Sequence, residues 1–127
     1  MEIDFAELKR IVLGLSVTDV STLEYRDRTY YVNPSSGEGP PGESFAPTYY
    51  DGADIYIWRR VPQKFRRPVI IHEVVEADLS YHQHLPRSVA HQTAVEIDRR
   101  FARETLDAAT LTEYELFRER CERSSQS

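Results

Sequence analysis

The chain has a single cysteine, only two lysines and no long apolar run. One cysteine, Cys121, cannot form a disulfide within the chain, and it excludes the zinc sites that are built from several cysteines. No apolar segment approaches the roughly 20 residues that span a bilayer. The amphipathic start of the chain lacks the apolar core of a signal peptide. We therefore expect a cytoplasmic protein with no membrane partner.

Acidic residues outnumber basic ones, 21 to 16, but basic residues gather in one stretch, "WRRVPQKFRRP". The net charge of −5 argues against a protein that binds polyanions over its whole surface. Within the stretch, the basic residues sit among Trp58 and Phe65, a mixture that contacts phosphates and stacks on bases. The segment is either an ordinary connector or a surface that binds nucleic acid or an acidic protein. Its basic residues are Arg59, Arg60, Lys64, Arg66 and Arg67.

The first half of the chain predicts one helix and a few strands. A length of 127 residues fits a single domain with a modest core, which we assign to residues 1–123. Apolar positions within Ile3–Leu15 recur at helical spacing, and Asp4 is a suitable cap. The segment Thr22–Asn33 predicts two short strands or one bent strand. The alternation of aliphatic and aromatic residues in Ala53–Arg60 predicts the clearest strand.

Two segments are predicted to be irregular. Residues 34–47, "PSSGEGPPGESFAP", are rich in Pro, Gly and Ser and predict a flexible loop. A lid over a substrate is the alternative interpretation of this loop. Residues 124–127 are polar and terminal, and we expect them to form a disordered tail.

The second half of the chain predicts three helices. The first runs from about Pro68 to Tyr81, with Pro68 in its first turn, and "HQHLP" ends it. The second runs over Arg87–Leu106, and a final helix follows. A short connection between helices predicts an antiparallel hairpin. The predicted fold class is therefore α+β: an N-terminal helix, a small antiparallel or mixed sheet, a C-terminal helical hairpin and a final helix.

The helix that contains "IIHEVVEAD" carries polar residues in an apolar setting. It is apolar around nearly its whole circumference, which predicts a buried, central element. Within it, His72 and Glu76 lie one turn apart on the same face. A buried carboxylate needs a cation, a hydrogen-bond donor or a proton. Glu76 is therefore expected to have a partner.

The next helix supplies further polar groups on its packed side. His91 and Asp98 fall on an apolar face beside small alanines. In an antiparallel hairpin, Glu76 comes level with His91, so that His72, Glu76 and His91 can converge. Two histidines and one carboxylate, with an open fourth position, form a known catalytic zinc site. Asp98 lies about one turn further on, where it either orients a histidine or replaces a ligand.

Glu73 completes the pattern because it follows His72 directly. In the zinc-protease motif H-E-x-x-H, the glutamate at this position is the general base. It accepts a proton from water whose pKa the metal lowers toward 7. Glu73 is therefore the predicted catalytic base of a zinc-dependent hydrolase.

With these residues, the chain resembles the small zincin-like metallopeptidases, including the ImmA/IrrE-like group. The resemblance covers about Ala53–Leu106: a strand "IYIW", a short connector, a helix opening "IIHE" and a second helix with further ligands. It implies a peptidase that binds a peptide or protein substrate along its edge strand, with His72 as a zinc ligand and Glu73 as the base. Glu76 departs from the family pattern, which has histidine there, and His91 is assigned from helix geometry alone.

Several alternatives stay open. The same polar residues can form a metal-free cluster that fixes the register of the helices. The chain can also be a non-catalytic interaction module that keeps the zincin-like scaffold and binds a protein or nucleic acid through residues 59–67. His82 and His84 are rival metal ligands. Candidates for stabilising an oxyanion are Tyr49, Tyr50 and Tyr81.

Overall fold

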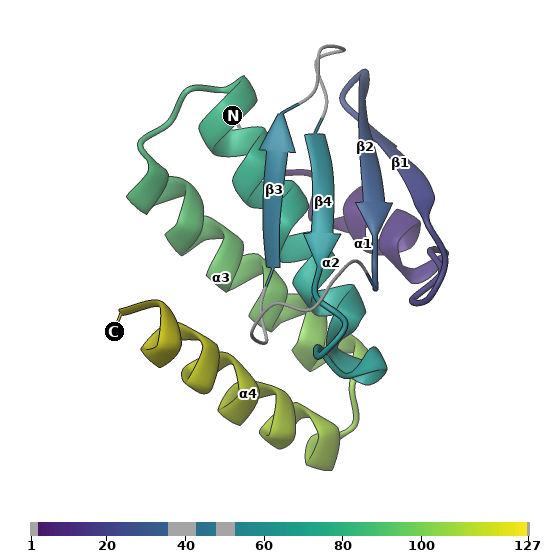
Figure 1. The fold of residues 1–127 in the computed structure, drawn as a ribbon, viewed down its shortest axis with the longest axis vertical. Helices are drawn as coiled ribbons and strands as arrows, with labels where there is room; N and C mark the ends of the chain where they lie inside the picture. The colour runs from purple at the N-terminus through teal and green to yellow at the C-terminus, as the bar shows by residue number, and fades with distance from the viewer. Residues whose placement is uncertain (1–2, 36–42, 48–52, 127) are drawn as a thin grey trace.

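A four-stranded sheet lies along one side of the molecule, with helices behind it (Figure 1). The computed structural model describes residues 3–35, 43–47 and 53–126. The elements in chain order are α1 (Phe5–Leu13), β1 (Ser21–Tyr25), β2 (Arg28–Asn33), β3 (Glu43–Pro47), β4 (Ala53–Ile57), α2 (Gln63–Ala77), η1 (Asp78–His82, a π-helical turn), α3 (Arg87–Thr105) and α4 (Ala108–Gln126). The predicted α+β class is confirmed.

The sheet is mixed, with the strand order β1-β2-β4-β3. β1 pairs antiparallel with β2, β2 parallel with β4, and β4 antiparallel with β3. The first pair is the two-strand interpretation of Thr22–Asn33, and the two residues between the strands, Arg26 and Asp27, have φ values of 52° and 62°. Positive φ at both positions is what a tight two-residue hairpin turn requires.

β3 corrects the predicted loop over residues 34–47. Residues 43–47 form a strand, with Ser44 opposite Tyr56 and Ala46 opposite Asp54 on β4. An edge strand joins a sheet through main-chain hydrogen bonds to one neighbour, so a short segment poor in apolar residues can do so. Residues 36–42 of the predicted loop lie outside the described residues. Because β3 flanks β4, the strand "IYIW" is internal. The resemblance placed that strand at the edge of the sheet, but β3 lies there instead.

α2 begins at Gln63, five residues earlier than predicted, so most of the supposed connector is helical. Pro68 lies inside the helix rather than in its first turn. The turn before the helix is fixed by Arg66, whose guanidinium donates to the carbonyl of Val61 at 2.9 Å and to that of Arg59 at 3.2 Å. The Arg66 side chain thus provides hydrogen-bond donors for two main-chain carbonyls at the start of the helix, which the sequence pattern did not predict.

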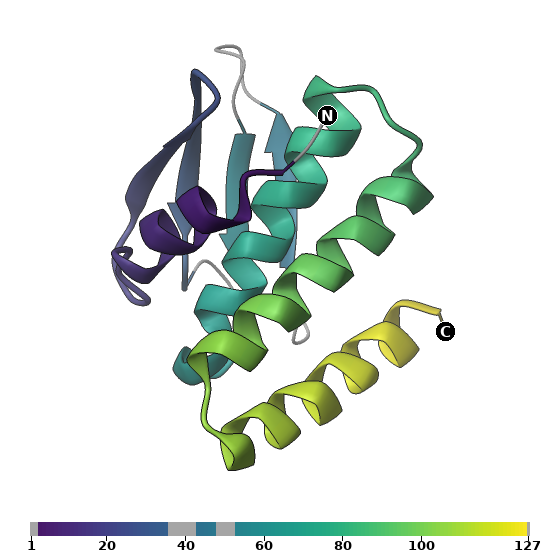
Figure 2. The ribbon, with the colours of Figure 1, turned by 180° about the vertical axis from the view of Figure 1, so that it is seen from behind.

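α2 is the central helix, as its apolar circumference predicted. All residues from Val69 to Ala77 are buried. The sheet covers one side of α2, and α3 lies beside it on the other, as the view from behind shows (Figure 2). Among the described residues, no helix combines the length and apolar character that crossing a membrane requires.

The last two helices lie where the sequence predicts them, but α4 extends further toward the C-terminus than predicted. α3 forms the expected hairpin with α2, and Ala90 and Ala94 are fully buried on it. Small residues at such positions let two helices approach closely. α4 continues to Gln126, so the predicted disordered tail at 124–127 is helical up to that residue. A helix that is already formed extends at the gain of one hydrogen bond per residue, even through polar residues.

Candidate metal centre

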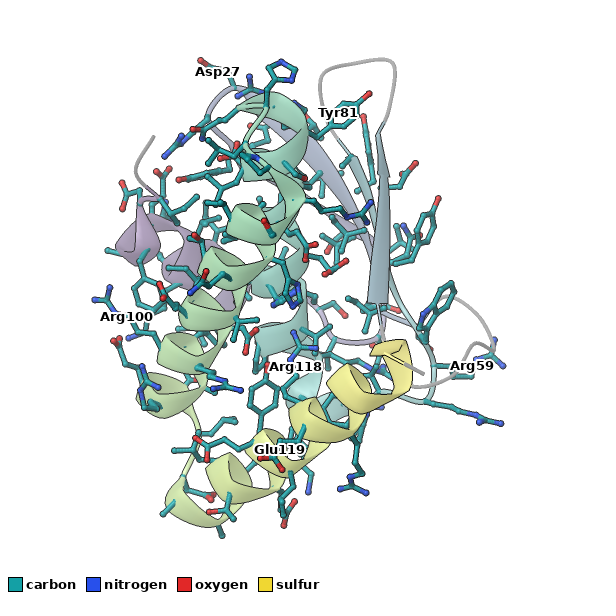
Figure 3. The ribbon with its side chains drawn as sticks, turned by 90° about the vertical axis from the view of Figure 1, so that its left-hand side faces the viewer. Asp27, Arg59, Tyr81, Arg100, Arg118 and Glu119 are labelled. Atoms are coloured by element: carbon teal, nitrogen blue, oxygen red, sulfur yellow. The ribbon has the colours of Figure 1, made fainter. Side chains whose placement is uncertain are left out.

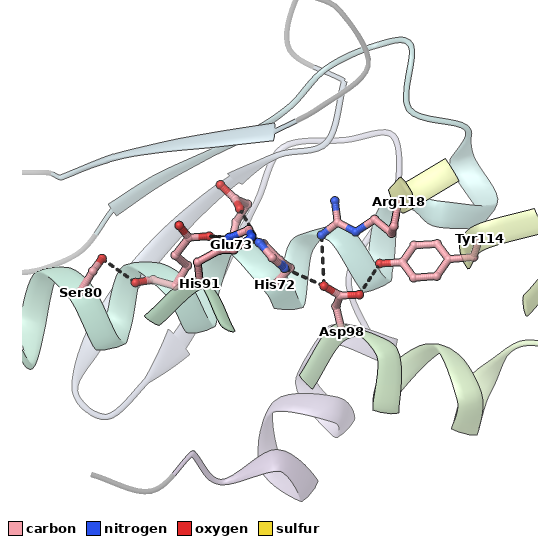
Figure 4. A network of polar contacts seen from close by, with 8 residues as sticks. His72, Glu73, Ser80, His91, Asp98, Tyr114 and Arg118 are labelled. Atoms are coloured by element: carbon pink, nitrogen blue, oxygen red, sulfur yellow. Dashed lines mark hydrogen bonds and ion pairs between the residues drawn. The ribbon is translucent and has the colours of Figure 1, made fainter. Parts of the chain in front are cut away.

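Three side chains from α2 and α3 converge between the two helices (Figure 4). Glu76 Oε2 lies 3.0 Å from His72 Nε2 and 3.4 Å from His91 Nδ1. One potential ligand atom from each residue lies within 4.8 Å of the other two. The hairpin geometry predicted this convergence. Whether the three side chains bind zinc stays a prediction.

The separations suit a tetrahedral zinc site. Two ligand atoms that each lie about 2.1 Å from a zinc ion are about 3.4 Å apart at the tetrahedral angle. The two separations around Glu76 are 3.0 and 3.4 Å, and the ligand atoms of His72 and His91 lie within 4.8 Å of each other. Two imidazole nitrogens and one carboxylate oxygen are also a donor set that zinc favours. The residues present therefore fit this metal in both chemistry and spacing.

The cluster is buried on one side and accessible on the other. The side chains of His72 and Glu76 are 3% and 10% exposed, whereas that of His91 is 51% exposed. The cluster thus meets solvent at His91, in the N-terminal part of α3. An accessible position beside the ligands is what a catalytic metal site needs, because a structural site is closed.

Asp98 lies where the first of its two predicted roles, orienting a histidine, would place it. Its Oδ2 lies 2.6 Å from His72 Nδ1, on the side of the ring opposite Glu76. A metal-binding histidine usually donates its second ring nitrogen to such a carboxylate, which fixes the orientation of the ring. Asp98 therefore leaves Nε2 of His72 as the nitrogen that faces the cluster.

α4 supplies two contacts that nothing in the sequence pattern had singled out. Tyr114 Oη donates to Asp98 Oδ1 at 2.8 Å, and Arg118 Nη2 donates to Asp98 Oδ2 at 3.2 Å. Figure 3 shows Arg118 pointing from α4 into the body of the molecule, whereas Arg59 points away from it. The sequence held one sign of these contacts: Tyr114 and Arg118 are four positions apart, and residues at that spacing share one face of a helix.

Glu73 lies at the edge of the same cluster. Its Oε2 is 3.6 Å from His72 Nε2, and its side chain is 5% exposed. The carboxylate is thus close enough to contact a water molecule held beside His72 and Glu76. This is the placement expected of the predicted general base.

The buried charges shift the pKa values of the cluster. Burial and the charge of Arg118 oppose protonation of His72, but hydrogen bonds to Asp98 and Glu76 and the charge of Glu73 outweigh them. The result raises the pKa of His72 to about 10. Burial opposes ionisation of Glu76 and Asp98, yet the hydrogen bonds and charges of their cationic partners lower the pKa of both carboxyl groups.

The cluster gathers three carboxylates around one imidazole. Glu73, Glu76 and Asp98 lie beside His72, and Arg118 contacts Asp98. Buried carboxylates need cationic partners. Without a metal, the raised pKa of His72 makes its ring such a partner. A bound metal ion would take the place of that proton, since a histidine must be neutral to bind it.

The rival ligands lie elsewhere. His82, on η1, packs edge-on against the rings of Tyr30 and Tyr81, with centroid distances of 6.0 and 5.4 Å. Within the described part of the chain, the group of potential ligands contains neither His82 nor His84. Tyr81 is 44% exposed. The other two candidates for stabilising an oxyanion, Tyr49 and Tyr50, lie outside the described residues.

The basic segment 59–67 does not present all of its charges to solvent. Besides its two bonds near α2, Arg66 donates to the carbonyl of Val17 at 2.7 Å, and its residue is only 5% exposed. Arg67 donates to the carbonyl of Leu15 at 2.8 Å, and Lys64 pairs with Glu113 of α4. These three cations bind parts of the chain itself.

Comparisons of the chain with protein-family models, with curated proteins and with solved structures found no match. The interpretation of the cluster therefore rests on its geometry and chemistry.

Proposed function

We propose that the chain is a zinc-dependent hydrolase in which His72, Glu76 and His91 bind the metal and Glu73 is the general base. The observation that carries the proposal is the convergence of two imidazoles and one carboxylate between α2 and α3, with donor atoms near the spacing of zinc ligands. The hydrogen bond between His72 Nδ1 and Asp98 adds support. In zinc sites, the histidine nitrogen that does not bind the metal usually donates to such a carboxylate.

The residues divide the chemistry between them. A bound zinc ion supplies Lewis acidity and lowers the pKa of water toward 7. Glu73 accepts a proton from the attacking water and later passes it to the leaving group. Asp98 holds the ring of His72 in place during both steps. The half-exposed side of the cluster at His91 is where the substrate approaches.

Peptides are the proposed substrate class. The resemblance to zincin-like metallopeptidases suggests them, and the position of β3 is consistent with it. In the described part of the sheet, β3 has a strand neighbour on one side only, and it lies next to α2. An extended peptide can add to such an edge through main-chain hydrogen bonds.

The replacement Glu73→Gln tests this function. We expect the variant to bind zinc like the wild type but to lose peptide hydrolysis by about 100-fold or more, because only the proton acceptor is removed. Hydrolysis of a mixed peptide library is followed by mass spectrometry, with zinc content measured on the same samples. Glu96→Gln is the matched control, because Glu96 is exposed on α3. Unchanged hydrolysis in Glu73→Gln would refute its role as base.

The second hypothesis, an interaction module that binds through residues 59–67, receives less support. Arg66 and Arg67 both use their guanidinium groups on main-chain carbonyls. Arg59, Arg60 and Lys64 are the exposed basic residues of the segment, and Lys64 pairs with Glu113. Salt-sensitive retention on an anionic matrix that Arg60→Glu abolishes would favour this hypothesis. Retention that does not change would leave it without support.

A further inference from the structure

We propose that α4 is a positioning element of the metal site, in which Tyr114 and Arg118 hold the Asp98 carboxylate, and through it the His72 ring, in the orientation that binds zinc. The inference rests on the proposed zinc site and adds to it the control of metal affinity by the docking of a separate helix. Tyr114 and Arg118 are positioning residues, since each would act on the metal ligands through Asp98.

The two α4 residues hold both oxygens of the carboxylate. Tyr114 donates to Oδ1 and Arg118 to Oδ2. Two donors on different oxygens fix the plane of the carboxylate, which a single hydrogen bond does not do. The residues lie four positions apart, so both reach Asp98 from one face of α4 (Figure 4).

The fixed carboxylate in turn fixes the histidine. Oδ2, the oxygen that Arg118 contacts, is also the oxygen that lies 2.6 Å from His72 Nδ1. Asp98 and His72 are 1% and 2% exposed, so solvent cannot readily replace a lost partner. If α4 moves away, Asp98 loses two donors at once, and the ring of His72 loses its fixed orientation.

Packing anchors α4 independently of Asp98. Phe65 of α2 contacts the rings of Tyr114 and Phe117, with centroid distances of 5.4 and 5.1 Å. Tyr114→Phe therefore removes the hydroxyl that reaches Asp98 but keeps the ring in the aromatic cluster. Phe117→Leu does the opposite: it loosens the packing of α4 without removing either donor to Asp98. The chain thus offers a matched pair of variants.

Zinc and cobalt ions are the probes. We expect Tyr114→Phe and Arg118→Met each to weaken zinc binding by about 10-fold or more, the range seen when residues that orient metal ligands are changed. Arg118→Lys, which keeps a cationic donor, should retain more of the affinity than Arg118→Met. Affinity is measured by competition with a chelator. In cobalt-loaded protein, the visible absorption band should shift in the first two variants but not in Phe117→Leu.

The coupling must also operate in the reverse direction. If docking of α4 strengthens zinc binding, zinc binding strengthens the docking of α4 by the same factor. Zinc should therefore slow hydrogen exchange of the main-chain amides in residues 111–121 of the wild type. The slowing should be smaller in Tyr114→Phe, because that variant lacks one of the bonds that transmit the coupling.

The outcomes separate this inference from the proposed function. A wild type that binds no zinc refutes the function and this inference with it. A wild type that binds zinc, with unchanged affinity and cobalt spectrum in Tyr114→Phe and Arg118→Met, refutes the positioning role alone. Equal weakening in Phe117→Leu at the same loss of stability would also refute it, since packing would then explain the effect.

Discussion

At the scale of single residues, His72 is the group whose environment is the least ordinary. One ring nitrogen faces Asp98 and the other faces Glu76, at 2.6 and 3.0 Å. Without a metal, a proton on this ring is the cation that the surrounding carboxylates stabilise. With a metal, the ion takes that place, since a histidine must be neutral to bind it. The same arrangement of carboxylates thus stabilises either a proton on His72 or a metal ion bound to it.

His72 gives the metal-free protein a predictable dependence on pH. Its pKa of about 10 in the folded chain lies above the ordinary value of 6.5. Because the folded state holds this proton more tightly, the stabilisation is complete below pH 6.5 and is lost as the pH rises through about 10. Urea unfolding after chelator treatment should therefore show stability falling across this window.

His72→Gln is the control for this dependence, because glutamine does not titrate. The difference in unfolding free energy between wild type and variant should shrink as the pH rises across the same window. Asp98 and Glu76 act at the opposite end. Their pKa values are lowered, so their stabilisation is present above the ordinary carboxyl range and is lost in acid. A difference between wild type and His72→Gln that stays constant with pH would contradict the assigned charge of His72.

Arg66 is the residue in the basic segment with the clearest structural role. It donates three hydrogen bonds to main-chain carbonyls before and beside α2. Arg66→Ala should lower the free energy of unfolding by about 3 kcal/mol, because buried acceptors are left without donors. The exposed Arg60→Ala should change it by less than about 0.5 kcal/mol. Equal effects in urea unfolding would contradict this role.

At the scale of elements, the site depends on how closely α2 and α3 approach. Ala94 is fully buried on α3, three residues after His91. Ala94→Leu should cost about 1–3 kcal/mol of stability through overpacking. It should also weaken zinc binding, because the helices that carry the ligands are pushed apart. Gln92→Leu, an exposed change on the same helix, should do neither; chemical unfolding and chelator competition measure both effects.

The part of the site that the sequence predicts is the part that depends on regular helix geometry. Counting residues across a short connection places Glu76 level with His91, and the observed 3.4 Å contact agrees. α4 lay beyond that reasoning, because helical periodicity does not set the angle at which a third helix packs. Tyr114 and Asp98 are 16 positions apart, and only tertiary packing brings them together.

The strands likewise separate into one that local periodicity predicts and one that depends on its pairing in the sheet. The alternation in β4 identifies it from sequence, because a sheet face buries every second residue. β3 was wrongly assigned to a loop, because its place in the sheet comes from main-chain pairing with β4 rather than from an apolar pattern. The early start of α2 was also missed, since Arg66 stabilises that turn by tertiary contacts with carbonyls such as that of Val17.

At the scale of the whole molecule, metal binding should stabilise the fold. A ligand that binds only the folded state at 100 times its dissociation constant adds about 2.7 kcal/mol to the free energy of unfolding. Zinc should raise the thermal midpoint of the wild type, and a chelator should reverse the shift. His91→Ala should not respond, because it lacks one of the three ligands. A shift of equal size in His91→Ala would show that zinc stabilises the chain from another site.

The most direct test of the central claim is the number of zinc ions bound per chain. The protein is purified without a histidine tag, offered zinc at neutral pH, separated from excess metal and measured by elemental analysis. The geometry of His72, Glu76 and His91 predicts about one zinc per wild-type chain and none in His72→Ala or His91→Ala. A wild type without zinc, or variants that retain it, would contradict the claim and leave the buried residues as a polar cluster that fixes α2 against α3.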